Sequence, residues 1–417
     1  MLFRKEKGME NKLKEYAKLL VEVGVNIQKG QTLLLFAPVD QAPFARMCAD
    51  VAYENGCREV VMMWNDDHMT RAKYLHADEA VFDEFPQYRA DMMTMYAREG
   101  AAFLHLIADD PENLLGVDSN RILRAHKASG EKLLEYRRYQ DQNIFPWGIG
   151  ALSSPKWAKK VFLDLSEQDA IDALWDKIFM ACRVKGDGSA VEAWRQHAEN
   201  LKKHVQILND YHFEKLHYQN ALGTDLWVEL ADAHVWEAGG DRTAQGQEYM
   251  PNIPTEECFT ANKKTGINGV VCASMPLCRD GNVIENIRFT MENGRIVKAE
   301  ATKGEDILKA AISVDEGASY FGEVALVPYD SPISNSKTLY YETLFDENAA
   351  CHFAFGKAYA SNIAGGANMT KEELREAGIN DSITHVDFMV GTADLSVTGY
   401  THDGREFPVF INGNFAF

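Results

Sequence analysis

The chain has 417 residues, of which 46% are hydrophobic and 25% are charged, and its formal net charge at pH 7 is −19. This composition is typical of a folded globular protein and argues against a disordered or membrane-spanning chain. The negative charge repels phosphate backbones and anionic lipids, so it argues against nucleic-acid or membrane partners. The length exceeds that of one ordinary hydrophobic core, which predicts two domains.

The cysteines and the N-terminal segment bear on the compartment. The seven cysteines are scattered and show no Cys-x-x-Cys spacing, which argues against a disulfide framework or a thiolate zinc site. The N-terminal segment is charged and lacks the apolar centre of a secretory signal. We therefore expect a cytoplasmic protein.

The first half of the chain alternates apolar runs with helical patterns. We expect strands at residues 32–36, 59–64 and 101–107, and helices near 42–55, 111–140, 166–184 and 188–207. Strands that alternate with helices predict an α/β domain with a largely parallel sheet. We place the end of this domain near residue 208, so that it comprises residues 1–208.

The second half has a different pattern, with short strand candidates between turns. The candidates lie at 214–218, 225–230, 267–273, 283–290 and 296–302, and one turn is Glu292-Asn-Gly-Arg295. This spacing is typical of antiparallel strands. We expect residues 209–417 to form a β-rich α+β domain.

Side chains that can bind metals gather in this second half. His385 and Asp387 lie two apart in an expected strand, so their side chains share one face and a divalent cation can take both. Taken alone, this pattern is slightly better explained by a surface strand with alternating polar residues.

A second histidine follows an expected helix start. Asp346-Glu347 place acids in the first turn, and on the helix that follows, His352 and Tyr359 would share a face because they lie seven apart. A histidine beside apolar neighbours is more often a core residue, and an aromatic residue on a helix face is usually packing. This segment alone is therefore weak support for a site.

Two carboxylates complete the set of candidates. Glu323 begins an apolar strand that ends at Pro328, and a buried carboxylate there needs a metal or an Arg as its partner, unless the strand edge is exposed. Two prolines stiffen residues 251–257, so Glu256 and Glu257 should point to opposite sides and only one can face a shared site. The alternative is that both are solvated.

Three carboxylates and two imidazoles form a mixed nitrogen and oxygen ligand set. Such a set suits Zn²⁺, Co²⁺ or Mn²⁺, with Mg²⁺ as a further candidate, and its size suits two ions that share a bridging carboxylate. Two adjacent ions can lower the pKa of a bridging water and polarise a carbonyl, as amide hydrolysis requires. The residues by themselves are compatible with a binuclear hydrolase and favour nothing more specific.

Four segments, in order, carry a family resemblance: Asn252-Ile-Pro-Thr-Glu-Glu257, Gly322-Glu-Val-Ala-Leu-Val-Pro328, Leu344-Phe-Asp-Glu-Asn-Ala-Ala-Cys-His352 and His385-Val-Asp387. They resemble the metallo-aminopeptidase family known as aminopeptidase T, aminopeptidase S or PepS, and the likeness extends over nearly the whole chain from about Met9. The resemblance implies release of N-terminal amino acids from peptides at a two-metal centre. It also implies a homodimer with an internal cavity that limits substrates to short peptides with a free N-terminus.

The resemblance also implies roles for individual residues. The positions that match the family's metal ligands are Glu257, Glu323, His352, His385 and Asp387. Tyr359 matches a site tyrosine, whose hydroxyl would help an ion to stabilise the oxyanion, and Glu323 or another of the carboxylates would bridge the ions. Two other interpretations stay open, namely a metal-dependent hydrolase of a different amide and a non-catalytic protein whose metal braces the C-terminal domain.

Overall fold

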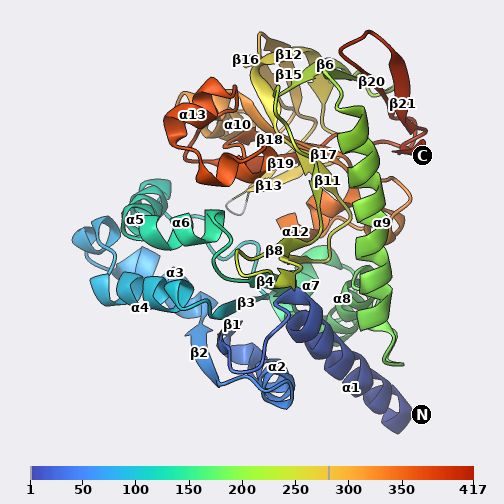
Figure 1. Cartoon of the computed structure of the whole chain (residues 1–417). Helices are drawn as coiled ribbons and strands as arrows, with labels where there is room; N and C mark the ends of the chain where they lie inside the picture. Colours follow the sequence, from blue (N-terminus) through green and yellow to red (C-terminus); the bar gives the residue numbers. More distant parts are fainter. Residues whose placement is uncertain (1, 280–281) are drawn as a thin grey trace. The chain divides into compact units, whose positions relative to one another are not determined.

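The computed structural model describes residues 2–279 and 282–417, which form two compact units (Figure 1). Unit 1 runs to Gln196 and also includes Gly240–Pro254, while unit 2 comprises His197–Gly239 and Thr255–Phe417. The division falls within helix α9 (Ala190–Tyr211). Because α9 continues across this point, no change of composition marks it in the sequence. Independent folding of two domains with a boundary near residue 208 stays a prediction.

Unit 1 is built on a five-stranded sheet with the order β10-β4-β3-β1-β2. Its strands are β1 (Thr32–Pro38), β2 (Glu59–Asn65), β3 (Ala102–Ile107), β4 (Trp147–Ala151) and β10 (Asn252–Ile253). All of the pairings in this sheet are parallel, as the sequence predicts. β1 is a nearly continuous buried run because helices cover both faces of parallel sheets.

Helices fill most of the chain between these strands. They are α1 (Leu2–Leu19), α2 (Ala42–Glu54), α3 (Asp67–His76), α4 (Gln87–Arg98), α5 (Ser119–Lys132), α6 (Leu134–Asp141), α7 (Pro155–Val161) and α8 (Glu167–Ala181). In the described part of the chain, no helix is long and apolar enough to cross a membrane.

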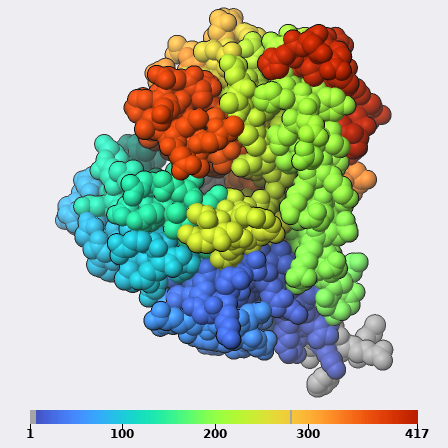
Figure 2. Space-filling view, viewed as in Figure 1, coloured from blue at the N-terminus to red at the C-terminus, as the bar shows by residue number. Residues whose placement is uncertain are grey.

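The segment 240–254 returns to unit 1 from later in the sequence. It contains the short hairpin of β8 (Asp241–Arg242) and β9 (Glu248–Tyr249). The Met250 N–H donates to the Gly24 carbonyl over 2.8 Å, and the Asn26 amide donates to the Glu248 carbonyl over 2.6 Å. Figure 2 shows this segment in yellow against the blue N-terminal residues of the same unit.

Unit 2 contains two larger antiparallel sheets. The five-stranded sheet has the order β19-β18-β17-β11-β7, with β7 (Glu237–Ala238), β11 (Cys258–Thr260), β17 (Phe321–Leu326), β18 (His352–Gly356) and β19 (His385–Met389). The eight-stranded sheet contains β16 (Arg295–Glu300), β15 (Arg288–Glu292), β12 (Asn262–Cys272), β6 (Asp225–Leu230), β5 (Lys215–Gln219), β20 (Ser396–Tyr400), β21 (Glu406–Ile411) and β22 (Asn414–Phe415), in this order. The β-rich second half is therefore confirmed.

Smaller elements complete unit 2. They are the strands β13 (Leu277–Arg279) and β14 (Asn282–Ile284) and the helices α10 (Glu305–Ala311), α11 (Pro332–Asn335), α12 (Thr343–Asp346) and α13 (Lys371–Glu376). The single strand expected at 283–290 is wrong. The chain forms β14 and then β15, because Asn286 adopts a φ of 55° that ends the extended conformation between them.

The helix expected to carry His352 and Tyr359 is also wrong. α12 ends at Asp346, one 3₁₀ turn follows as η5 (Glu347–Ala349), and His352 begins strand β18. β18 lies between β17 and β19 and is buried along its whole length. Tertiary packing of this apolar run therefore decides its conformation, and the acids before it form only a short turn.

Candidate metal centre

Three neighbouring strands of the five-stranded sheet, β17, β18 and the edge strand β19, present four polar side chains on one face. Glu323 on β17 is opposite Ala354 on β18, which is opposite Asp387 on β19. His352 is opposite Ala325, and His385 is opposite Gly356. Residues that face each other across a strand pair, and residues two apart along a strand, project to the same side. The alternate positions Phe353, Phe355 and Phe388 belong to the hydrophobic core of unit 2.

Small residues between these polar side chains leave room for them. Ala325, Ala354 and Gly356 occupy the positions directly opposite the polar residues. Gly356 has a φ of +111°, and a Cβ built on it would lie 2.1 Å from the Thr384 carbonyl oxygen. Only glycine fits where the β18 backbone approaches the start of β19 so closely.

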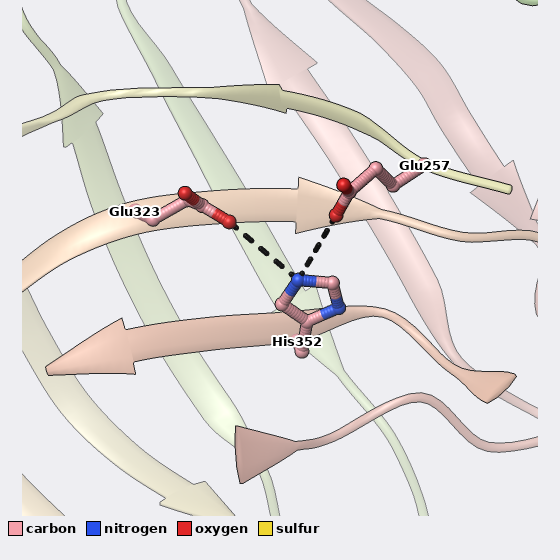
Figure 3. Close-up of side chains that lie close together, drawn as sticks. All are labelled: Glu257, Glu323 and His352. Atoms are coloured by element: carbon pink, nitrogen blue, oxygen red, sulfur yellow. Dashed lines mark ion pairs between the residues drawn. The ribbon is translucent and has the colours of Figure 1, made fainter. Parts of the chain in front are cut away.

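Glu257 is the residue just before β11, and its side chain lies on the same face of the sheet. Its Oε2 lies 3.2 Å from His352 Nε2, and Glu323 Oε1 lies 3.5 Å from the same nitrogen (Figure 3). The neighbouring Glu256 points elsewhere, since its Oε2 lies 3.5 Å from His197 Nε2. Of the two adjacent glutamates, Glu257 is the one that joins the cluster.

A second group of ligand atoms adjoins the first. His385 Nε2 lies 3.2 Å from Asp387 Oδ1 and 3.7 Å from Glu323 Oε2. The two groups are Glu257, Glu323 and His352, and Glu323, His385 and Asp387, and within each group the ligand atoms all lie within 4.8 Å of one another. Glu323 belongs to both groups.

Backbone carbonyls orient both imidazoles. His352 Nδ1 lies 3.2 Å from the Ala350 carbonyl oxygen, and His385 Nδ1 lies 2.7 Å from the Lys357 carbonyl oxygen. A carbonyl can only accept, so Nδ1 carries the hydrogen in each ring and Nε2 faces the carboxylates. This is the arrangement in which a neutral histidine binds a metal through Nε2.

The electrostatics of the cluster favour a bound cation. Burial alone would lower the pKa of His385, but the Asp387 and Glu323 carboxylates and the Lys357 carbonyl together outweigh burial and raise that pKa to about 9. Burial raises the pKa of Glu323 despite its contacts with the histidines. In the described part of the chain, the ion pairs of Glu257, Glu323 and Asp387 are with the two histidines of the cluster. Divalent cations would replace the protons of the histidines and balance the excess of negative charge, so the donor set fits a metal centre.

Tyr359 lies beside the second group. Its ring centroid is 4.9 Å from that of His385, and the residue follows the end of β18 in the sequence. The residue is 41% exposed, yet burial around its hydroxyl and the charge of Glu323 raise the pKa of the phenol well above its usual value. The hydroxyl therefore keeps its proton at neutral pH.

Glu347 is a further carboxyl of the site that the sequence did not assign to it. Burial, and after it the charges of Asp387 and Glu257, raise the pKa of Glu347 well above its usual value. In the sequence this residue reads only as an acid in the first turn of a helix. The one feature of the sequence that could have placed Glu347 at the site is its position within the segment Asp346–His352, which leads to a predicted ligand.

A family model described as thermophilic metalloprotease (M29) matches residues 9–415. The chain belongs to this family. It is 48% identical to aminopeptidase AmpS of Bacillus subtilis (strain 168) over 410 residues, which cover 98% of this chain and 100% of that protein. It is 39% identical to aminopeptidase T of Thermus aquaticus over 401 residues, which cover 96% of this chain and 97% of that protein.

A solved structure also matches the fold. Wild-type AmpT from Thermus thermophilus aligns with a TM-score of 0.91 at 36% identity, covering 98% of this chain and 100% of that one. The family match, these relatives and the buried ligand groups together show that the chain is a metal-dependent aminopeptidase of the M29 family.

Proposed function

We propose that this aminopeptidase holds two divalent ions and releases the first residue of short peptides that have a free amino terminus. Glu257 and His352 would hold one ion, His385 and Asp387 the other, and Glu323 would serve both. The observation that carries this proposal is that two compact groups of ligand atoms share one carboxylate. A shared carboxylate is typical of two-metal hydrolytic sites.

The ligand types support Zn²⁺, Co²⁺ or Mn²⁺, because a mixed set of imidazole and carboxylate ligands can hold each of these ions. When bound, such ions polarise the scissile carbonyl and lower the pKa of a water molecule. The carbonyls of Ala350 and Lys357 hold the imidazoles in the tautomer that this binding needs.

Two further side chains supply proton chemistry. Burial raises the pKa of Glu347 well above its usual value, so this carboxyl holds a proton more tightly than an ordinary glutamate and can donate it as a general acid. The Tyr359 hydroxyl keeps its proton and can donate a hydrogen bond to the oxygen on which negative charge develops. The carboxylates of the cluster also favour a substrate ammonium group over a blocked N-terminus.

Leucine p-nitroanilide and its N-acetylated counterpart test this function. The protein is assayed as purified, after removal of metal with a chelator, and after Co²⁺, Zn²⁺ or Mn²⁺ is added back. We expect hydrolysis of the free-amine substrate only, lost on chelation and restored by metal. Equal cleavage of the acetylated compound would instead indicate a hydrolase of other amides. No turnover on a panel of free-amine peptides, with metal demonstrably bound, would indicate a structural metal site.

The homodimer and the cytoplasmic location are also part of the proposal. They follow from the resemblance and from the composition of the chain. Sedimentation equilibrium tests the dimer directly, because a mass near 46.8 kDa would mean a single chain and would contradict it.

A further inference from the structure

Asn348 is a fully buried residue in the turn that leads into β18. It lies in η5, between Glu347 and the strand that carries His352. A buried side-chain amide needs partners for both its oxygen and its nitrogen. Its contacts therefore show which parts of the chain it holds together.

The amide of Asn348 links two segments that are far apart in the sequence. Its Oδ1 accepts a hydrogen bond from the Glu256 backbone N–H over 2.7 Å, and its Nδ2 donates to the Leu344 carbonyl over 2.9 Å. Nδ2 also lies 3.5 Å from Glu347 Oε1. A backbone N–H only donates and a carbonyl only accepts, so these partners fix the orientation of the amide.

This link matters for Glu257 because β11 does not include it. The pairing of β11 with β17 begins at Cys258, which is opposite Leu326. The hydrogen bond to Asn348 holds the chain on the other side, at Glu256. Glu257 is thus fixed from both directions, and its Oε2 lies 3.2 Å from His352 Nε2.

We propose that Asn348 is a positioning residue of the metal centre. It holds Glu257 against His352 and keeps the Glu347 carboxyl beside the cluster, and it does so without being a ligand itself. The inference rests on the proposed function only where it concerns turnover, because the placement of Glu257 bears on metal affinity whatever the substrate.

The test compares Asn348→Ala with a matched control, Asn209→Ala. The Asn209 amide also bonds to the backbone through both of its polar atoms. Its Oδ1 accepts from the Trp236 N–H over 2.9 Å, and its Nδ2 donates to the Trp236 carbonyl over 3.1 Å. Zn²⁺ affinity is measured by competition with a chelator, alongside the Tm of the metal-free protein, kcat and KM. The Tm of both variants should fall by a few degrees. The expected fall is about 2–4 °C for each hydrogen bond that is lost.

Only Asn348→Ala should lose metal affinity and kcat. We expect a fall in each of about 10–100-fold with little change in KM, which is the range for residues that orient metal ligands. Zn²⁺ affinity and kcat within twofold of the parent, with a Tm loss like that of Asn209→Ala, would overturn the proposal. That result would show that Asn348 only stabilises the fold.

Asn348→Asp separates the contact with Glu256 from the contacts made by Nδ2, and it also decides the question if the alanine variant does not fold. Aspartate keeps an acceptor for the Glu256 N–H but has no donor for the Leu344 carbonyl or for Glu347. We expect Zn²⁺ affinity at or above that of the parent, with kcat about tenfold lower. A Zn²⁺ affinity as low as that expected for the alanine variant would contradict the tether to Glu256. Absence of peptidase activity in the parent would refute the proposed function, while the Zn²⁺ affinities would still decide the role of Asn348.

Discussion

Replacing Glu323 by glutamine should have opposite effects on the metal-free and the metal-loaded protein. In the metal-free protein, burial outweighs the contacts with His352 and His385 and raises the pKa of Glu323. A group with a raised folded-state pKa stabilises the fold at low pH, and this contribution is lost as pH rises through that pKa. Glutamine resembles the protonated form and does not titrate. Metal-free Glu323→Gln should therefore be as stable as the parent, or more stable, at neutral pH and above.

The metal-loaded protein should lose stability instead, because Glu323 belongs to both ligand groups. An ion present at 100 times its Kd adds about 2.7 kcal/mol to the free energy of unfolding, so two ions add about 5 kcal/mol. For a unit of this size that corresponds to a rise in Tm of roughly 10–20 °C. Glu323→Gln should lose most of the rise, whereas a change at Asp387, which belongs to one group, should lose about half.

Differential scanning calorimetry with and without Zn²⁺ measures both effects, and hydrolysis of leucine p-nitroanilide follows activity. Activity of Glu323→Gln should fall by more than the roughly 100-fold that a change next to a metal ligand causes. A metal-induced rise in Tm equal to that of the parent would show that Glu323 does not serve two ions. A large loss of stability in the metal-free variant would show that its charge is needed for folding.

Four other changes test separate parts of the account. Because the pKa of metal-free His385 is about 9 and a metal needs the neutral imidazole, the apparent Zn²⁺ affinity of the ligand group that contains His385 should rise about tenfold per pH unit and level off near pH 9, as calorimetric titrations at several pH values would show. Gly356→Ala should lower the free energy of urea unfolding by at least about 1–3 kcal/mol, since the added Cβ meets a backbone carbonyl at 2.1 Å. Tyr359→Phe should lower kcat by about 100-fold and leave Zn²⁺ affinity unchanged, and an unchanged kcat would remove the hydroxyl from the reaction. Glu15→Gln should cost about 1–2 kcal/mol of stability with normal activity, because Glu15 Oε1 accepts from the Ala190 N–H over 2.8 Å at the start of α9.

Three strands of the parallel sheet of unit 1, β1, β2 and β3, could be predicted because they are apolar runs between clear turns, whereas β4 was not expected. Strand β1 is the plainest case, with buried side chains on both faces. The segment 240–254 could not be predicted to join unit 1. Its strand β10 has only two residues, and a pairing that short leaves no periodic pattern in the sequence.

The candidate site was predictable where a local pattern fixes the geometry. His385 and Asp387 lie two apart on β19, so their shared face follows from strand geometry alone. His352 was expected on a helix because Asp346-Glu347 resemble the acidic first turn of one, and β18, buried on both faces, shows no alternation that would indicate a strand instead. The approach of Glu347 to Asp387 and Glu257 depends on how three distant segments pack, which no local pattern encodes.

The most direct test of the two-metal account is a titration of the metal-free protein with Co²⁺ while hydrolysis of leucine p-nitroanilide is followed. The account predicts that activity rises from near zero to a plateau when two ions are bound per chain, with no activity on the N-acetylated substrate. A plateau at one ion per chain, or activity that does not depend on metal, would contradict it.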